Sequence, residues 1–430
     1  MIFCVIITKG GRAMIIELRV NNYKIFNEKA SLSTKADLRN KKFAFNVFKD
    51  KSCNVLKSLV VFGPNNVGKT CMVQCIKDIK NVLDNVRPLN IMPNLFTKNT
   101  VSELGITFLS NGRVFSYDFK YDVRSKEFIY ECFAEQSVKS KSTLIYFKKD
   151  FVKNDYVFKD NEEIEKLLSV IGRNNILIYL IDTAKFAELA WIKEVLVGFS
   201  KIIDVVSMDD IPIQKTIDIL KSKNPMKQKI VEFIKNADLD LDNFEYNRNA
   251  LKKLKIEMNM PGEELSNMEA ALKAQKNLLD QLCLVSRHKG MDLPSVLIDS
   301  TGTKKIVALA SYVIEAIEQG RILVVDELDS SLHFKLTRAI VALFNNEVNA
   351  CGQLICTIHD ISLLDCKKLF RKEQIWFIHR DTEKVWLYSL SEFKARDHGT
   401  RDTTDIIEHY KKGLYGALPE PNLINTLLGV

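Results

Sequence analysis

Apolar and polar residues alternate along much of the first third of the chain, a pattern that predicts half-buried β-strands. Six segments follow this pattern: residues 14–26, 30–34, 103–109, 114–121, 127–133 and 143–147. Two of them flank Ser110-Asn111-Gly112-Arg113, and an Asn-Gly turn between alternating segments predicts a β-hairpin. We therefore expect an antiparallel sheet in this part of the chain.

Helical and strand-like segments alternate in the last third of the chain. Ile306, Leu309, Val313 and Ile317 form one apolar stripe of a helix predicted over residues 303–317. Further helices are expected at residues 334–344 and 361–370, and strands at residues 322–325, 353–357, 374–378 and 384–388. Short, fully apolar strands are typical of parallel sheets that are buried on both faces. This alternation predicts an α/β core with a largely parallel sheet.

The middle of the chain is mixed and mostly helical, with a strand-like run at residues 176–181. It contains no repeat and no low-complexity linker, so we interpret it as an insertion into one core. The expected organisation is an N-terminal extension (1–13), an N-terminal lobe (14–150), an α-rich insertion (151–285) and a C-terminal lobe (286–430). The predicted fold class is α/β, with a mixed, largely parallel core sheet and an antiparallel β-subdomain.

An eight-residue segment stands between a strand predicted at residues 55–62 and a helical pattern that continues to Asp84. It reads Gly63, Pro64, Asn65, Asn66, Val67, Gly68, Lys69 and Thr70. Backbone N–H groups of such a loop, with the helix N-terminus behind them, form a cradle for anionic oxygens. Lys69 would reach the β- and γ-phosphates of a nucleotide, and the Thr70 hydroxyl would bind Mg²⁺. An ordinary glycine turn is the alternative, but the strand–loop–helix context favours a nucleoside triphosphate site.

Two carboxylates follow the strand predicted at residues 322–325, and one histidine follows the next strand. Asp326 stands where a nucleotide site needs a carboxylate for the magnesium shell, and Glu327 suits the orientation of an attacking water. Two carboxylates at the end of a buried strand are costly unless a metal or hydrogen bonds offset their charge. A lone histidine is usually structural, but the position of His359 favours a contact that senses the γ-phosphate.

A second anion-binding pattern, Ser300-Thr301-Gly302-Thr303, opens the helix predicted over residues 303–317. A Ser-x-Gly-Thr at a helix start presents a hydroxyl, backbone N–H groups and the positive end of the helix dipole to an anion. One subunit already has its phosphate loop for that purpose. We therefore expect Ser300, Gly302 and Thr303 to close over a nucleotide that another subunit holds.

Charge and composition limit the classes of partner. The 430 residues carry 62 Lys and Arg against 54 Asp and Glu, a net charge of +8. This excess is mild, and the sequence contains no block of five or six like charges. The charge therefore permits contact with DNA but does not argue for it. The nine cysteines lack C-x-x-C and zinc-type spacings, as is typical of reduced thiols in a cytoplasmic protein. No run approaches about 18 uninterrupted apolar residues, so no membrane span is expected.

These motifs together resemble the ABC-type ATPase heads of the SMC, RecF and OLD class. The resemblance rests on the phosphate loop, the Ser-x-Gly-Thr signature, Asp326-Glu327, the Asp-Ser-Ser-Leu-His run at residues 329–333, and Thr357-x-His359. Within that class the chain looks most like compact prokaryotic ATPases of abortive-infection, phage-defence systems (AbiL/RloA-like). That likeness covers residues 14–122 and 286–421 and is weak across the insertion.

The resemblance implies an ATP-hydrolysing homodimer with ATP and Mg²⁺ between its subunits. Thr70 and Asp326 would hold the metal. Glu327 would be the catalytic carboxylate and His359 the switch histidine. Asp329 would lie in a loop that crosses the dimer interface. Such ATPases often work beside a separately encoded effector, a Toprim-type nuclease.

Two features of the chain depart from the pattern of this class. The signature begins with Asp299, where many relatives have a glutamate. Residues 85–100 contain no glutamine, although relatives usually carry a Mg²⁺-sensing glutamine after the first core helix. The second departure leaves the coupling between the nucleotide and the insertion without an assigned residue.

Two functions remain open from the sequence. The first is an ATP-dependent dimeric switch that senses phage infection and controls an effector. The second is a DNA-repair or DNA-binding ATPase similar to RecF, which predicts salt-dependent DNA binding. Long heptad-patterned arms are absent, which argues against a true SMC protein. A kinase or a signalling GTPase is disfavoured because neither needs a Ser-x-Gly-Thr helix.

Overall fold

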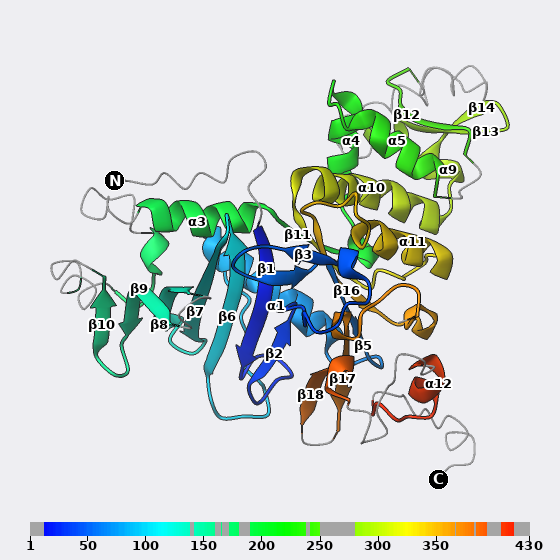
Figure 1. The fold of residues 1–430 in the computed structure, drawn as a ribbon. Helices are drawn as coiled ribbons and strands as arrows, with labels where there is room; N and C mark the ends of the chain where they lie inside the picture. The colour runs from blue at the N-terminus through cyan, green and yellow to red at the C-terminus, as the bar shows by residue number, and fades with distance from the viewer. Residues whose placement is uncertain are drawn as a thin grey trace, which may run out of the picture.

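The structure is a computed structural model that describes residues 13–137, 142–159, 165, 172–179, 190–237, 241–249, 280–365, 367–381, 384–393 and 406–416. In this part of the chain, two sheets lie on either side of a helical layer, and a smaller lobe packs at one end (Figure 1). None of the described helices combines the length and the apolar character that a membrane crossing requires. Residues 1–12 of the predicted N-terminal extension lie outside the described residues.

The core sheet has six strands in the order β11-β15-β16-β5-β17-β18. Their bounds are β5 (Ser58–Phe62), β11 (Ile203–Ser207), β15 (Ile322–Asp326), β16 (Gln353–Ile358), β17 (Ile375–Arg380) and β18 (Val385–Ser389). All neighbours are parallel except β17 and β18. Every residue of β5, β15 and β16 is buried, as expected for strands that helices cover on both faces. The predicted largely parallel core sheet is confirmed.

The second sheet has seven antiparallel strands in the order β10-β9-β8-β7-β6-β1-β2. Their bounds are β1 (Ala13–Asn21), β2 (Ala30–Ser33), β6 (Val101–Ser110), β7 (Arg113–Asp122), β8 (Glu127–Gln136), β9 (Thr143–Asp150) and β10 (Asp155–Phe158). The predicted hairpin joins β6 to β7. Asn111 and Gly112 adopt φ angles of 49° and 75° there, the conformation that a two-residue hairpin turn requires.

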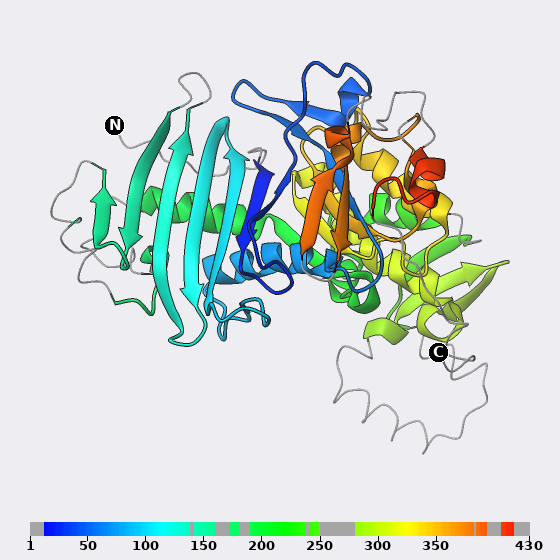
Figure 2. The same cartoon turned by 90° about the horizontal axis from the view of Figure 1, so that it is seen from below.

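Helices α1 (Lys69–Leu83) and α3 (Ala190–Lys201) fill the space between the two sheets (Figure 2). Helix α1 contacts β6 of the antiparallel sheet and β15 and β16 of the core sheet. The rings of Phe108 on β6 and Phe199 on α3 stack with centroids 3.9 Å apart. On the opposite face of the core sheet, α10 (Thr301–Gln319) and α11 (Phe334–Phe344) bury their apolar stripes.

One glutamine side chain joins the two sheets. The Gln353 side chain accepts a hydrogen bond from the Ile15 N–H at 2.8 Å and donates to the Ile15 carbonyl at 2.9 Å. It therefore acts as a one-residue strand beside β1, next to the register shift between Ile15 and Glu17. The same amide also donates to the Leu56 carbonyl, so the chain just before β5 is held at this junction.

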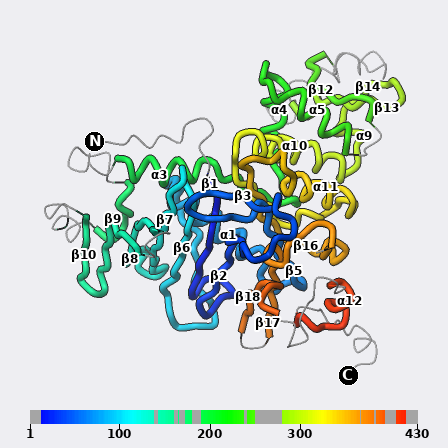
Figure 3. Tube along the Cα trace, in the orientation of Figure 1, coloured from blue at the N-terminus to red at the C-terminus, as the bar shows by residue number. Residues whose placement is uncertain are grey.

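A smaller lobe packs beside α10 (Figure 3). It contains α4 (Gln214–Lys221), α5 (Lys227–Lys235), the sheet of β12 (Asn243–Tyr246), β13 (Leu284–His288) and β14 (Met291–Pro294), and α9 (Ser295–Ile298). The Thr216 hydroxyl of α4 donates to the Val307 carbonyl of α10 at 2.9 Å. Elsewhere, β3 (Val47–Lys49) pairs with β4 (Asn54–Leu56), and α12 (Ile406–Lys411) lies near the end of the described chain.

Residues 151–285, predicted as a mostly helical insertion, contribute to several layers. Strand β10 extends the antiparallel sheet, α3 lies between the sheets, and β11 forms one edge of the core sheet. The predicted strand-like run at residues 176–181 is described only as far as residue 179, and Leu177–Tyr179 is a 3-10 helix. Its Leu177 N–H donates to the Glu131 carboxylate at 2.9 Å, so a side chain replaces the strand ladder as its partner.

Glu131 belongs to a fully buried ion pair in the antiparallel sheet. Its Oε2 lies 3.0 Å from Lys149 Nζ, and both side chains are 0% exposed. Tyr117 also donates to this carboxylate, and Lys149 donates to the Asn175 carbonyl at 2.8 Å. These hydrogen bonds offset the loss of hydration that two buried charges suffer.

Lys149→Met tests this pair. The substitution leaves the Glu131 carboxylate buried without its cation, so the free energy of unfolding should fall by about 3–5 kcal/mol in urea titrations. Glu131→Gln combined with Lys149→Met should lose less, because no unpaired charge remains. Lys120→Met, at the partly exposed pair with Glu103 on the same sheet, is the control and should lose about 0–1 kcal/mol. Equal losses at both lysines would contradict this account.

Candidate nucleotide site

The predicted phosphate loop joins β5 to α1, and two of its glycines are required by close neighbours. A Cβ at Gly63 would lie 2.4 Å from the Ile378 carbonyl oxygen. Gly68 has a φ of 99°, and a Cβ there would lie 1.8 Å from Ile25 Cδ1. Asn66 also adopts a left-handed conformation, with a φ of 62°, which asparagine tolerates better than most residues. The loop therefore brings backbone close to its neighbours at both ends.

Lys69 is the first residue of α1 and is buried, with 5% exposure. Its Nζ donates to the Gly63 and Pro64 carbonyls, both at 2.7 Å. Burial lowers the pKa of Lys69 to about 8, although the nearby carboxylates of Glu327, Asp326 and Asp329 favour the charged form. A bound phosphate group would add negative charge beside Lys69 and would favour its charged form further.

Asp326 and Glu327 are linked by one hydroxyl from the neighbouring strand. Thr357 Oγ1, on β16, donates to Asp326 Oδ1 at 2.6 Å and accepts from the Glu327 N–H at 2.7 Å. Asp326 is 6% exposed, and Glu327 has a left-handed φ of 55°. Thr357 thus offsets the burial of one carboxylate and holds the strained backbone of the next residue. The sequence motif contained Thr357, but no chemical role for it was predicted.

His359 lies between the lysine and the glutamate because β16 lies between β5 and β15. Its Nδ1 is 3.3 Å from Lys69 Nζ, and its Nε2 is 3.3 Å from Glu327 Oε1. The backbone here is held by Asp329, whose Oδ2 accepts from the N–H groups of His359 and Asp360 at 2.8 and 2.6 Å. Four residues that the sequence analysis singled out therefore lie close together: Lys69, Glu327, Asp329 and His359.

These side chains surround one cavity of about 650 Å³. It is lined by Ile25, Asn65, Asn66, Gly68, Lys69, Thr70, Cys71, Glu327, Asp329, Ser330 and His359. Ile25 was not predicted, because it comes from the turn between β1 and β2, far from the loop in sequence. The one sequence feature consistent with this contact is the glycine at position 68, where a Cβ would collide with Ile25.

The predicted signature lies outside this cavity. Ser300 caps α10: its Oγ accepts from the Thr303 N–H at 3.2 Å. A Cβ at Gly302 would lie 2.7 Å from the Ser331 carbonyl oxygen, so α10 begins against the segment that follows Glu327. Lys305 reinforces this contact by donating to Ser330 Oγ at 3.1 Å and Ser331 Oγ at 3.2 Å. The segment at residues 327–331 therefore touches the cavity on one side and the signature on the other.

The donor set of the cavity fits a magnesium-bound triphosphate. Loop N–H groups, the α1 N-terminus and Lys69 suit phosphate oxygens, while the Thr70 hydroxyl suits Mg²⁺. The Asp326 carboxylate also suits Mg²⁺, but it is only 6% exposed and is not among the residues that line the cavity. Within the described ranges, no group of three or more His, Cys, Asp or Glu residues could hold a metal alone. Mg²⁺ would then need phosphate oxygens and water as its other ligands, as it usually does in nucleotide sites.

Comparison with known proteins gives one family match and several solved structures of low identity. The family described as "AAA domain, putative AbiEii toxin, Type IV TA system" matches residues 58–365. Three solved structures are similar at low identity: the SMC head domain from Thermotoga maritima, the SMC head bound to the C-winged helix domain of ScpA, and the recombination mediator protein RecF in the RecFOR pathway. Their identities are 13%, 13% and 14%, and their TM-scores are 0.40, 0.44 and 0.36. They cover 87%, 88% and 86% of this chain, and 98%, 99% and 96% of their own chains.

The fold and the cavity define a P-loop ATPase head with a largely parallel core sheet and an antiparallel subdomain. The chain belongs to the AAA-domain family named above. This family match supports the predicted P-loop ATPase class. No curated protein matches the chain.

The lowered pKa of Lys69 predicts proton uptake when ATP binds. Near pH 9, with a pKa of about 8, most Lys69 side chains are neutral in the free protein, and bound phosphates should restore the charge. Titration calorimetry in two buffers of different ionisation enthalpy should show uptake approaching one proton at pH 9 and little at pH 7. Lys69→Arg, whose guanidinium stays charged, should abolish the uptake. Binding enthalpies that do not depend on the buffer at pH 9 would contradict the assignment.

Proposed function

We propose that this chain binds and hydrolyses ATP at composite sites formed by two copies of itself, so that the nucleotide switches dimerisation. The observation that supports this most directly is the position of the signature. Gly302 lies against the 327–331 segment, and Ser300, Gly302 and Thr303 are not among the residues that line the cavity with Lys69. The start of α10, where Ser300 is exposed, would face the γ-phosphate of a nucleotide on a second copy.

The predicted site residues would then have the following roles. Lys69 and the loop N–H groups would bind the phosphates, and Thr70 and Asp326 would hold Mg²⁺. The metal would offset negative charge on the phosphate oxygens. Glu327 would accept a proton from the attacking water and orient it. His359, whose Nε2 is 3.3 Å from Glu327 Oε1, would hold this carboxylate and respond to the γ-phosphate.

We further propose that this ATPase works in the cytoplasm in an abortive-infection response, with the ATP-bound dimer controlling a separate effector such as a Toprim-type nuclease. The family description, which names the AbiEii toxin, supports a defence role. The free state of the described cysteines fits a reducing compartment. Bacteria that express the chain with its neighbouring gene should resist phage, and the Lys69→Met form should not protect them. Salt-dependent DNA binding that stimulates turnover, without protection, would favour the RecF-like alternative.

Thr357→Val tests the link between the two carboxylates. The substitution keeps the branched shape but removes the hydroxyl between Asp326 and the Glu327 N–H, so kcat should fall about 10–100-fold while ATP affinity changes little. Thr337→Val is a matched control, because Thr337 is equally buried and its hydroxyl has no hydrogen-bond partner in the described structure. Steady-state kinetics check both variants. A similar loss of kcat in both would contradict the role of Thr357.

Glu327→Gln tests the dimer. The variant should bind ATP without hydrolysing it, so the ATP-bound dimer should accumulate. Light scattering after size exclusion should report a mass near twice 49.2 kDa with ATP and Mg²⁺, and the monomer mass with ADP. The double variant Lys69→Met/Glu327→Gln should stay monomeric. A monomer at saturating ATP would overturn the composite-site proposal.

A further inference from the structure

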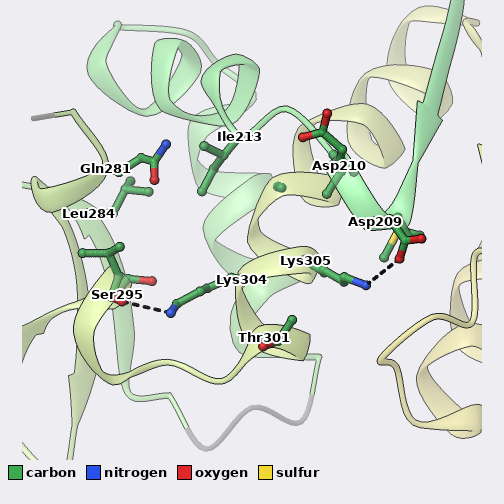
Figure 4. A pocket seen from close by; sticks show the side chains of 13 residues that line it. Asp209, Asp210, Ile213, Gln281, Leu284, Ser295, Thr301, Lys304 and Lys305 are labelled. Atoms are coloured by element: carbon green, nitrogen blue, oxygen red, sulfur yellow. Dashed lines mark hydrogen bonds and ion pairs between the residues drawn. The ribbon is translucent and has the colours of Figure 1, made fainter. Parts of the chain in front are cut away.

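A cavity separates the smaller lobe from part of the first turn of α10, which carries the signature. It measures about 280 Å³ and lies between that turn, α9 and residues 208–213 (Figure 4). Lys304 and Lys305 line this cavity. Lys304 donates to the Val296 carbonyl at 2.9 Å, and Lys305 Nζ lies 3.5 Å from Asp209 Oδ1. On this side the first turn of α10 borders open space, whereas on its other side Gly302 packs against Ser331.

Asp299, the residue directly before the signature, connects the start of α10 to the smaller lobe. Asp299 has a side chain that is only 1% exposed. Its Oδ2 accepts hydrogen bonds from the hydroxyls of Ser286 and Ser295, the latter at 2.6 Å. Its Oδ1 lies 3.1 Å from His288 Nε2. One carboxylate therefore collects three side-chain partners immediately before Ser300.

The partners of Asp299 belong to the smaller lobe. Ser286 and His288 are on β13, the central strand of the lobe sheet, and Ser295 begins α9. A carboxylate only accepts hydrogen bonds, and charged acceptors make stronger ones than neutral acceptors do. Because Asp299 is buried, loss of any partner would leave it with an unmet demand for donors. The carboxylate therefore ties the start of α10 to β13.

We propose that Asp299 is a positioning residue that places Ser300, Gly302 and Thr303 for the nucleotide of the partner subunit, and that the β12–β14 sheet sets the ATPase rate through it. This inference rests on the proposed composite site. Displacement by about 1 Å can lower a rate about 100-fold, so the contact is sensitive enough to control turnover. Asp299 would also couple the lobe to the nucleotide without a Mg²⁺-sensing glutamine, which residues 85–100 do not contain.

Asp299→Ala should separate ATP binding from turnover. The subunit keeps its own phosphate loop, so the Kd for ATP should stay within about 2-fold, while kcat should fall about 10–100-fold. Retained ATP affinity also shows that the variant is folded. If Asp299→Ala does not fold, Asp299→Asn, which keeps the shape and one acceptor, replaces it and should give a smaller loss of the same kind. Ser286→Ala combined with His288→Ala removes two partners from the lobe side and should lower kcat in the same way.

Mixing variants tests whether Asp299 acts across the dimer. Lys69→Met subunits contribute an intact signature, and Asp299→Ala subunits contribute an intact phosphate loop. Each heterodimer then has one complete site, so an equal mixture should recover about a quarter of the wild-type turnover per subunit. No recovery would mean that Asp299 acts on the nucleotide of its own subunit, and the inference would be wrong.

Two controls distinguish this inference from the function on which it rests. Ser300→Arg mixed with Lys69→Met should also recover turnover; failure there would overturn the composite site itself. Asp292→Ala breaks the Arg287–Asp292 ion pair of the same hairpin without touching the Asp299 carboxylate, and should leave kcat within about 2-fold. A loss of kcat at Asp292 equal to that at Asp299 would reduce the effect to general damage of the lobe and would contradict the proposal.

Discussion

The site depends on the register of three adjacent parallel strands. Strand β16 lies between β5 and β15, and pairing places Thr357 beside Val61, just before the phosphate loop, and Cys356 beside Val325, just before Asp326. The ends of all three strands therefore meet at one edge of the core sheet. The lysine, the carboxylates and the histidine converge because of this register, although they are far apart in sequence.

The segment at residues 327–331 connects this edge to the signature. Glu327 begins it and Ser331 ends it, each with a left-handed φ, 55° and 63° respectively. Such conformations persist only where the surroundings hold them, here Thr357 on the cavity side and Gly302 on the signature side. The 327–331 segment therefore links the cavity to the signature of the same subunit within a few residues. The lobe acts on the signature from its other side, through Asp299.

The sequence predicts best what local pattern determines. The sequence predicts the phosphate loop, the apolar strand before Asp326 and the stripe of helix α10, because residue spacing alone defines them. It does not predict contacts between distant segments. Gln353 gives no sequence signal that its amide replaces a strand beside Ile15, and Ile25 is an ordinary turn residue until it packs over Gly68. The apolar run around Leu177 predicts a strand, but Leu177 lies in a 3-10 helix and its N–H donates to the Glu131 carboxylate.

The central claim is that each ATP is enclosed by two copies of the chain. ATP turnover per subunit, measured across protein concentrations from nanomolar to micromolar, tests it most directly. A site completed by a second subunit should lose specific activity on dilution and reach a plateau at high concentration. Turnover per subunit that stays constant over the whole range, in a protein that is monomeric by light scattering, would contradict it.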